Sequence, residues 1–189
     1  MKVTDMTLQE STDLSRLAVL IVDDSHNIRK IVCEILRSNG FKNVKEAASG
    51  IEAFEVLKVA SIDLMILDLV MDQLDGIETA KLLRRGSDSP NKTLPIIMIT
   101  GHTVRSNVVK ARDAGINEII AKPFTAQVLI DHLKTVMRSK RQWIDVATYT
   151  GPDRRRRASE AYAGPMRRAS DGLSAESAAD VDGPSSAVG

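Results

Sequence analysis

The sequence predicts an α/β fold in which a parallel sheet of five strands is covered by helices on both faces. Short apolar runs alternate with segments of helical periodicity five times within about 120 residues, the order typical of such a sheet. Residues 64–68 are apolar up to a final carboxylate, which fits a central strand buried on both faces. Polar residues end several runs, where an open α/β sheet has its functional crevice.

The first half of the pattern begins with a strand at residues 17–22. Ser25 is a suitable N-cap for the next helix, because its hydroxyl can accept a hydrogen bond from a free amide of the first turn. Apolar residues then recur from Ile28 at i, i+3, i+4, i+7 and i+8, which predicts one buried stripe, and Gly40 ends the helix. A strand, a helix and the central strand follow at 44–47, 50–59 and 64–68.

The second half repeats the alternation. Pro95 precedes a strand at 96–99, and a helix at 106–114 is stopped by Gly115, as a glycine just after a helix C-terminus would stop it. The remaining predicted elements are a helix at 76–85, a strand at 119–121 and a last helix with an apolar stripe between Val128 and Met137.

Composition excludes several classes of protein. The formal charge of +1 argues against a globally basic nucleic-acid binder, and no DNA-binding domain is expected. The single Cys33 permits neither an intrachain disulfide nor a zinc cluster and is expected to be a small buried thiol. No apolar run approaches the ~20 residues that span a bilayer, so we expect a cytoplasmic protein without a membrane span.

Three regions are predicted along the chain. Residues 1–16 are polar and form a flexible leader, and residues 17–140 form the folded domain. Residues 141–189 are dominated by Gly, Pro, Ser, Ala, Arg and Asp, a composition that cannot form a core, so we expect a disordered tail.

Acids and a lysine at the predicted strand ends define a candidate site. Asp23 and Asp24 follow the first strand, Asp68 ends the third, Thr100 ends the fourth and Lys122 follows the fifth. Clustered carboxylates repel each other and favour a bound cation, of which Mg²⁺ suits hard oxygen ligands that also contact phosphate. A carboxylate beside such an ion can form an aspartyl-phosphate, while a hydroxyl and an ammonium offset the charge of the phosphoryl oxygens.

This ordered set resembles the receiver domain of two-component response regulators, most closely the small CheY-like kind, over about residues 17–140. The resemblance implies a flavodoxin-like sheet with strand order 2-1-3-4-5. It also implies that Asp68 accepts a phosphoryl group from a histidine kinase or phosphotransfer protein. It does not imply a turnover enzyme, because phosphotransfer and autodephosphorylation are the family's intrinsic chemistry.

The resemblance also assigns roles within the site. Asp24, Asp68 and the Val70 carbonyl would ligate Mg²⁺, with Asp23 assisting through water. Thr100 and Lys122 would bind the phosphoryl oxygens, and the Lys122–Pro123 bond is expected to be cis.

Two positions depart from the family pattern. Asp72 stands where proline is usual, which adds a negative charge near the site. Ile119 replaces a common Tyr or Phe, so the aromatic rotamer switch of the family is not available.

The tail contains an internal repeat at 149–171. Each copy has a tyrosine, a Gly-Pro pair, consecutive arginines, Ala-Ser and an acid, an order that solubility does not require. Arginine can bind guanine O6 and N7 bidentately and stack on the base, and further arginines can bind phosphate. Two such copies suit a ligand with two guanines and two phosphates, cyclic di-GMP.

Within the second copy, which runs from Tyr162 to Asp171, Arg168 and Asp171 have the RxxD spacing seen at the inhibitory site of diguanylate cyclases. A CheY-like receiver with an arginine-rich extension resembles the Cle family of cyclic di-GMP effectors, of the CleD type, which act at the flagellar motor. The resemblance implies control of motility and attachment through docking to a motor protein. The residues predicted to bind the nucleotide are Tyr149, Asp153, Arg154, Arg155, Arg156, Arg157, Tyr162, Arg167, Arg168 and Asp171.

Alternatives remain open from the residues alone. The acids can serve only as helix caps in a receiver that is not phosphorylated. The tail can be inert, which would leave a phosphorelay intermediate or phosphate sink. It can also contact RNA or anionic lipid nonspecifically.

Overall fold

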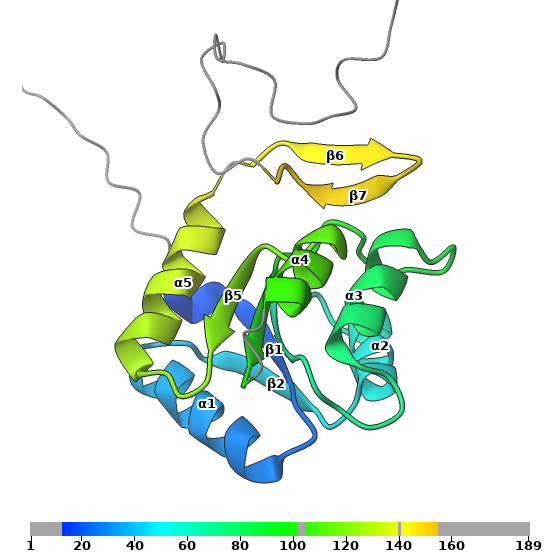
Figure 1. Cartoon of the computed structure of the whole chain (residues 1–189). Helices are drawn as coiled ribbons and strands as arrows, with labels where there is room; N and C mark the ends of the chain where they lie inside the picture. The colour runs from blue at the N-terminus through cyan, green and yellow to red at the C-terminus, as the bar shows by residue number, and fades with distance from the viewer. Residues whose placement is uncertain (1–12, 102–104, 140, 155–189) are drawn as a thin grey trace, which may run out of the picture. The chain divides into compact units, whose positions relative to one another are not determined.

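The structure is a computed structural model that describes residues 13–101, 105–139 and 141–154 (Figure 1). Its core is a parallel sheet of five strands in the order β2-β1-β3-β4-β5, which confirms the predicted fold class and strand order. The observed strands begin and end within one residue of their predicted bounds. They are β1 Ala18–Val22, β2 Asn43–Ala47, β3 Leu64–Asp68, β4 Ile96–Thr100 and β5 Glu118–Ala121.

Helices cover both faces of the sheet (Figure 1). Side chains alternate along β1. Val19 and Ile21 pack against α1 and α5 on one face of the sheet, whereas Leu20 and Val22 pack against α2, α3 and α4 on the other. Cys33 of α1 is buried, as predicted. The helices are α1 His26–Ser38, α2 Gly50–Val59, α3 Gly76–Arg85, α4 Arg105–Asp113 and α5 Ala126–Arg138.

Caps fix where the helices beside the sheet edge begin. Ser25 caps α1, as predicted, and Asp75 forms a capping box with Glu78 at the start of α3. Gly76 lies against the backbone carbonyl of Asp68, and a Cβ at this position would collide with it. The start of α3 is therefore packed directly on the end of β3.

The leader ends earlier than predicted. Leu14–Arg16 form a short 3-10 helix, η1, instead of continuing the flexible segment. Asp13 caps it by accepting a hydrogen bond from the Ser15 amide at 3.1 Å, and Leu14 packs against the core. The rest of the predicted leader lies outside the described residues.

The tail also begins later than predicted. Residues 141–154 were expected to lack structure, but Trp143–Val146 (β6) and Tyr149–Pro152 (β7) form an antiparallel hairpin. All residues of β7 are buried. An isolated two-stranded hairpin is marginally stable, so this one depends on its contacts with the rest of the folded domain.

Arg84, near the end of α3, makes the principal contact with the hairpin. Its side chain is 1% exposed and its guanidinium donates to three carbonyl oxygens, of Lys92 and Leu94 at 2.8 Å each and of Gly115 at 3.0 Å. The same guanidinium lies 5.1 Å from the ring centroid of Trp143, within cation–π range. Burial lowers the pKa of Arg84 to about 10, so it stays charged at neutral pH.

Other contacts attach both ends of the hairpin segment. Arg141 pairs with Glu118 at 2.8 Å, and Arg85 donates to the Thr148 carbonyl at 2.7 Å. Gly115 has φ +82° and lies against the backbone of Thr150, a position where a side chain would be strained and crowded. Within the described residues, no helix has the length and apolar character to cross a bilayer.

Candidate functional site

Asp23, Asp68 and Lys122 meet at the carboxyl ends of β1, β3 and β5, and we call this group the acid site. The Lys122 ammonium nitrogen lies 2.6 Å from Oδ1 of Asp68 and 3.1 Å from Oδ2 of Asp23. Asp23 is 4% exposed and Asp68 is 7% exposed. The structure therefore brings together two predicted acids and the predicted lysine in a largely buried ion-pair network.

Main-chain amides hold the second oxygen of each carboxylate. Oδ2 of Asp68 accepts from the Val70 amide at 2.9 Å, and Oδ1 of Asp23 accepts from the Ser25 amide at 2.8 Å. Each amide lies two residues after its acid, where the chain leaves the strand. The side-chain orientations are thus fixed by the same turns that end β1 and β3.

The electrostatics of the site oppose a charged Asp68 that has no cation beside it. Burial raises the pKa of Asp68, against the opposing hydrogen bond and charge of Lys122. Burial alone would lower the pKa of Lys122, but its hydrogen bonds and charge interactions with Asp68 and Asp23 raise it. The lysine therefore stays protonated at neutral pH and supplies the positive charge between the two acids.

The remaining predicted residues lie around this group. Thr100 ends β4 and is 2% exposed, and its carbonyl accepts from the Lys122 amide at 2.8 Å. Asp24 is exposed, and Val70 is 57% exposed. The Lys122–Pro123 bond is cis, as the receiver resemblance implied.

The acid site has the ligand types that Mg²⁺ prefers, buried carboxylate oxygens beside an exposed acid and a solvent-facing turn. Across the described ranges, no three acidic, histidine or cysteine side chains are already grouped as a metal site. The Lys122 ammonium lies where it neutralises both buried acids. The donor set therefore fits a hard divalent cation that binds beside the Lys122 ammonium.

Ile119 and Thr100 border a narrow gap that has no room for a water molecule. The gap lies between β4, β5 and α4, where the family's aromatic residue would move. Ile119 places an aliphatic side chain at this closely packed gap.

Arg29 is a contributor that sequence reasoning missed. Its Nη1 donates to the Asp23 carbonyl at 2.8 Å and to the Asp24 carbonyl at 3.3 Å, and its Nε lies 3.4 Å from Glu46. A positive charge in the first turn of a helix interacts unfavourably with the helix dipole. An arginine at this position in the sequence therefore indicates that a specific partner compensates for the cost. Arg29 holds the turn that carries both acids.

The predicted nucleotide-binding residues are described only in part. Tyr149 is 6% exposed and donates its hydroxyl to the Pro152 carbonyl at 2.6 Å. The Arg154 guanidinium lies 3.9 Å from the Tyr149 ring centroid and 3.3 Å from Asp113. Asp153 is half-buried at the end of the hairpin. The others, Arg155, Arg156, Arg157, Tyr162, Arg167, Arg168 and Asp171, lie outside the described residues.

These contacts change the interpretation of Tyr149. The first tyrosine of the repeat is a packed residue of the hairpin, and Arg154 already occupies a face of its ring. A guanine base would have to displace Arg154 to stack there.

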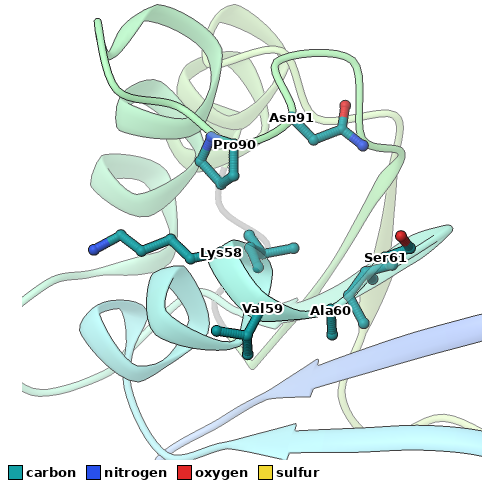
Figure 2. Close-up of a pocket in the computed structure, with 8 residues that line it drawn as sticks. Lys58, Val59, Ala60, Ser61, Pro90 and Asn91 are labelled. Carbon is teal, nitrogen blue, oxygen red and sulfur yellow. The ribbon is translucent and has the colours of Figure 1, made fainter.

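A separate hollow of about 320 Å³ lies between the end of α2 and the loop before β4 (Figure 2). Figure 2 shows Lys58, Val59, Ala60 and Ser61 from the α2 side and Pro90 and Asn91 from the loop. No residue of the acid site lines it.

The geometry of the acid site and the five-stranded sheet define a class of protein. The sequence matches the family model of the response regulator receiver domain over residues 19–134. Because this match covers well over half of the chain, the chain belongs to that family.

Particular relatives agree with this assignment. CheY-3, a chemotaxis protein of Vibrio cholerae, is 38% identical over 120 residues, which are 64% of this chain and 91% of that protein. CheY1, a chemotaxis protein of Helicobacter pylori, is 40% identical over 122 residues, 64% of this chain and 97% of that protein.

Solved structures show the same fold. CheY4 of Vibrio cholerae matches with a TM-score of 0.59 at 33% identity, covering 64% of this chain and 98% of that chain. The receiver domain of a sensor histidine kinase from Pseudomonas aeruginosa matches with a TM-score of 0.58 at 26% identity, covering 65% and 98%. The latter structure has a magnesium ion coordinated in its active-site cleft.

Proposed function

We propose that this chain is a response regulator that is phosphorylated on Asp68. The observation that carries the proposal is the 2.6 Å contact of Lys122 with Asp68, beside Asp23 at the carboxyl ends of the strands. The donor is a phosphohistidine of a histidine kinase or phosphotransfer protein. A carboxylate oxygen of Asp68 forms the new P–O bond while the P–N bond breaks, and the leaving imidazole takes up a proton.

The site residues divide this work. Asp24, Asp68 and the Val70 carbonyl are the proposed Mg²⁺ ligands, with Asp23 assisting through water, and the ion would supply charge neutralisation for the phosphoryl oxygens. Lys122 is already beside the accepting carboxylate and would bind one phosphoryl oxygen. Thr100 would bind another through its hydroxyl. The magnesium ion in the active-site cleft of the histidine kinase receiver domain supports a magnesium ion at this site.

The proposed output of phosphorylation is a contact with another protein. Two of its relatives are chemotaxis proteins, which supports a role in motility with a flagellar motor protein as partner, acting in the cytoplasm. Ile119 excludes an aromatic rotamer switch, so the docking surface must respond through other movements of α4 and β5.

The arginine-rich segment after the hairpin is proposed to bind cyclic di-GMP, as in the Cle family. The repeat supports this, because two copies of tyrosine, arginines and an acid match a ligand with two guanines and two phosphates. Arg154 begins the segment and is held by Tyr149 and Asp113. The ligand therefore engages the arginines that follow, and reaches Tyr149 only by displacing Arg154.

Isothermal titration of the full-length chain with cyclic di-GMP tests the tail proposal. Binding at micromolar concentration is expected, and it should be lost when five arginines become alanine, namely Arg155, Arg156, Arg157, Arg167 and Arg168. Replacing Arg37, Arg105 and Arg138, which are helical arginines outside the tail, is the matched control and should leave binding intact. Absence of heat with the unchanged chain would leave a phosphorelay intermediate or phosphate sink as the function.

A further inference from the structure

A cleft of about 430 Å³ lies between the hairpin and the end of α3, near the N-terminal end of β4. This volume is within the range of sites that bind small molecules. The acid site is at the opposite ends of the strands, so the cleft is separate from it. Its lining residues are Arg84, Arg85, Lys92, Asp145, Val146, Ala147 and Thr150.

The charge of the cleft favours an anion. Three cations line it, against the single carboxylate of Asp145. Arg84 contributes charge but not donors, because its guanidinium is committed to backbone carbonyls. Arg85 is exposed and uses Nη2 for the Thr148 carbonyl, and the exposed Lys92 ammonium has no ion pair within the described part of the chain. Arg85 and Lys92 are therefore the groups available to a ligand.

Asp145 supplies the second recognition element. Its Oδ1 accepts from the Thr150 hydroxyl at 2.8 Å, which fixes the carboxylate at the wall of the cleft. Thr150 is 8% exposed, so this orientation is held by a buried residue. The other oxygen of Asp145 can accept a hydrogen bond from a ligand hydroxyl or amino group. Val146 is 53% exposed and adds apolar surface beside it.

We infer that this cleft binds a phosphorylated small molecule of the nucleoside monophosphate class. The phosphate lies between Arg85 and Lys92, and a sugar hydroxyl or base amino group donates to Asp145. The arrangement depends on the docked hairpin, which contributes more than half of the lining residues. It is independent of the proposed tail function, because every lining residue precedes Arg155.

Amide NMR of the full-length ¹⁵N-labelled chain tests the inference, with guanosine monophosphate and inorganic pyrophosphate as probes. Saturable shifts of the amides at 92 and 145–150 are expected, with a dissociation constant for guanosine monophosphate below about 1 mM. Lys92→Gln should weaken binding at least about fivefold. Lys81→Gln, an exposed α3 lysine outside the cleft, should leave it unchanged.

The Asp145→Asn variant separates specific recognition from general charge attraction. The variant should bind guanosine monophosphate more weakly, because the hydrogen-bond donor of the ligand loses its carboxylate partner. It should bind pyrophosphate more tightly, because a negative charge near the phosphate site is removed. A chain in which the five tail arginines are alanine should bind guanosine monophosphate as the unchanged chain does. Absence of saturable shifts at 145–150, an equal loss in Lys81→Gln, or loss of binding with the tail variant would each overturn the inference.

Discussion

The Lys122 ammonium lies 2.6 Å from Oδ1 of Asp68, although the two residues are 54 positions apart in the chain. Strand order explains the contact, because β5 and β3 flank β4 and both end at the same edge of the sheet. The lysine also lies 3.1 Å from Asp23, so one cation holds two buried carboxylates together. The phosphorylation chemistry proposed for Asp68 depends on this network.

Removing the lysine charge should destabilise the receiver. Lys122→Met leaves Asp23 and Asp68 facing each other without a cation, and the free energy of unfolding should fall by about 1–3 kcal/mol. Added Mg²⁺ should restore part of the loss, because the ion replaces the missing charge. Urea unfolding with and without Mg²⁺ measures both effects, with the exposed Lys81→Met as control. Equal stability of the two variants would show that Lys122 does not stabilise the fold by offsetting the repulsion between Asp23 and Asp68.

The raised pKa values of Lys122 and Asp68 make the free energy of unfolding depend on pH in two separate ranges, one alkaline and one acidic. The folded pKa of Lys122 lies above its unfolded value of 10.5, so its contribution to stability is complete below that pH and is lost as pH rises through the folded pKa. Lys122→Met should remove this alkaline loss in urea unfolding. An unchanged alkaline slope in the variant would contradict the direction of the shift.

The raised pKa of Asp68 makes the stability of the fold depend on pH in the acidic range. Because its pKa is raised above 3.8 in the folded state, its contribution is present below that pH and is lost as pH rises through the folded pKa. The stability of Asp68→Asn relative to the unchanged chain should therefore increase as the pH rises above 3.8 and through the folded pKa of Asp68. Urea unfolding at several pH values measures this, and a relative stability that falls with pH would contradict it.

Gly76 should tolerate no side chain. Gly76→Ala places a methyl group against the Asp68 carbonyl, which must move the start of α3 or the end of β3. The free energy of unfolding should fall by about 1–3 kcal/mol, and phosphorylation should slow because Asp68 moves. Gly101→Ala is the control, since no described atom lies within 4 Å of the position that its added methyl group would take. Similar losses for the two variants would contradict the close-packing argument.

Arg84 should hold the hairpin on the receiver. Arg84→Met removes the donor from three carbonyl groups, two of them in buried hydrogen bonds, and the free energy of unfolding should fall by about 2–5 kcal/mol. Trp143 is the single tryptophan, so a red shift of its fluorescence should report loss of the contact. Arg37→Met, an exposed change in the last turn of α1, is the control. An unchanged emission maximum in Arg84→Met would show that the hairpin docks without this residue.

The sheet and the acid site were predictable because their signals are local. Each strand is a short apolar run, and Asp23, Asp68 and Lys122 follow such runs directly. Parallel strands align these ends, so sequence position alone places the side chains at one edge. The exposed position of Asp24 depends on how the turn after β1 is oriented, which the sequence does not determine.

The hairpin was not predictable for the opposite reason. Its strands have four residues each and lie in a segment rich in small and charged residues. Burial of β7 depends on Arg84 and Gly115, which are distant in the sequence. A tertiary contact of this kind overrides local composition. The same holds for Arg29, whose partners become evident only when β1, β2 and α1 are assembled.

Phosphorylation by a small phosphodonor is the most direct test of the central claim. The full-length chain is incubated with acetyl phosphate and Mg²⁺, and intact mass and peptide mapping locate the added phosphoryl group. We expect one phosphoryl group on Asp68, with none in Asp68→Asn or after chelation of Mg²⁺. A folded chain that remains unmodified, or an Asp68→Asn variant that is labelled like the unchanged chain, would contradict the account.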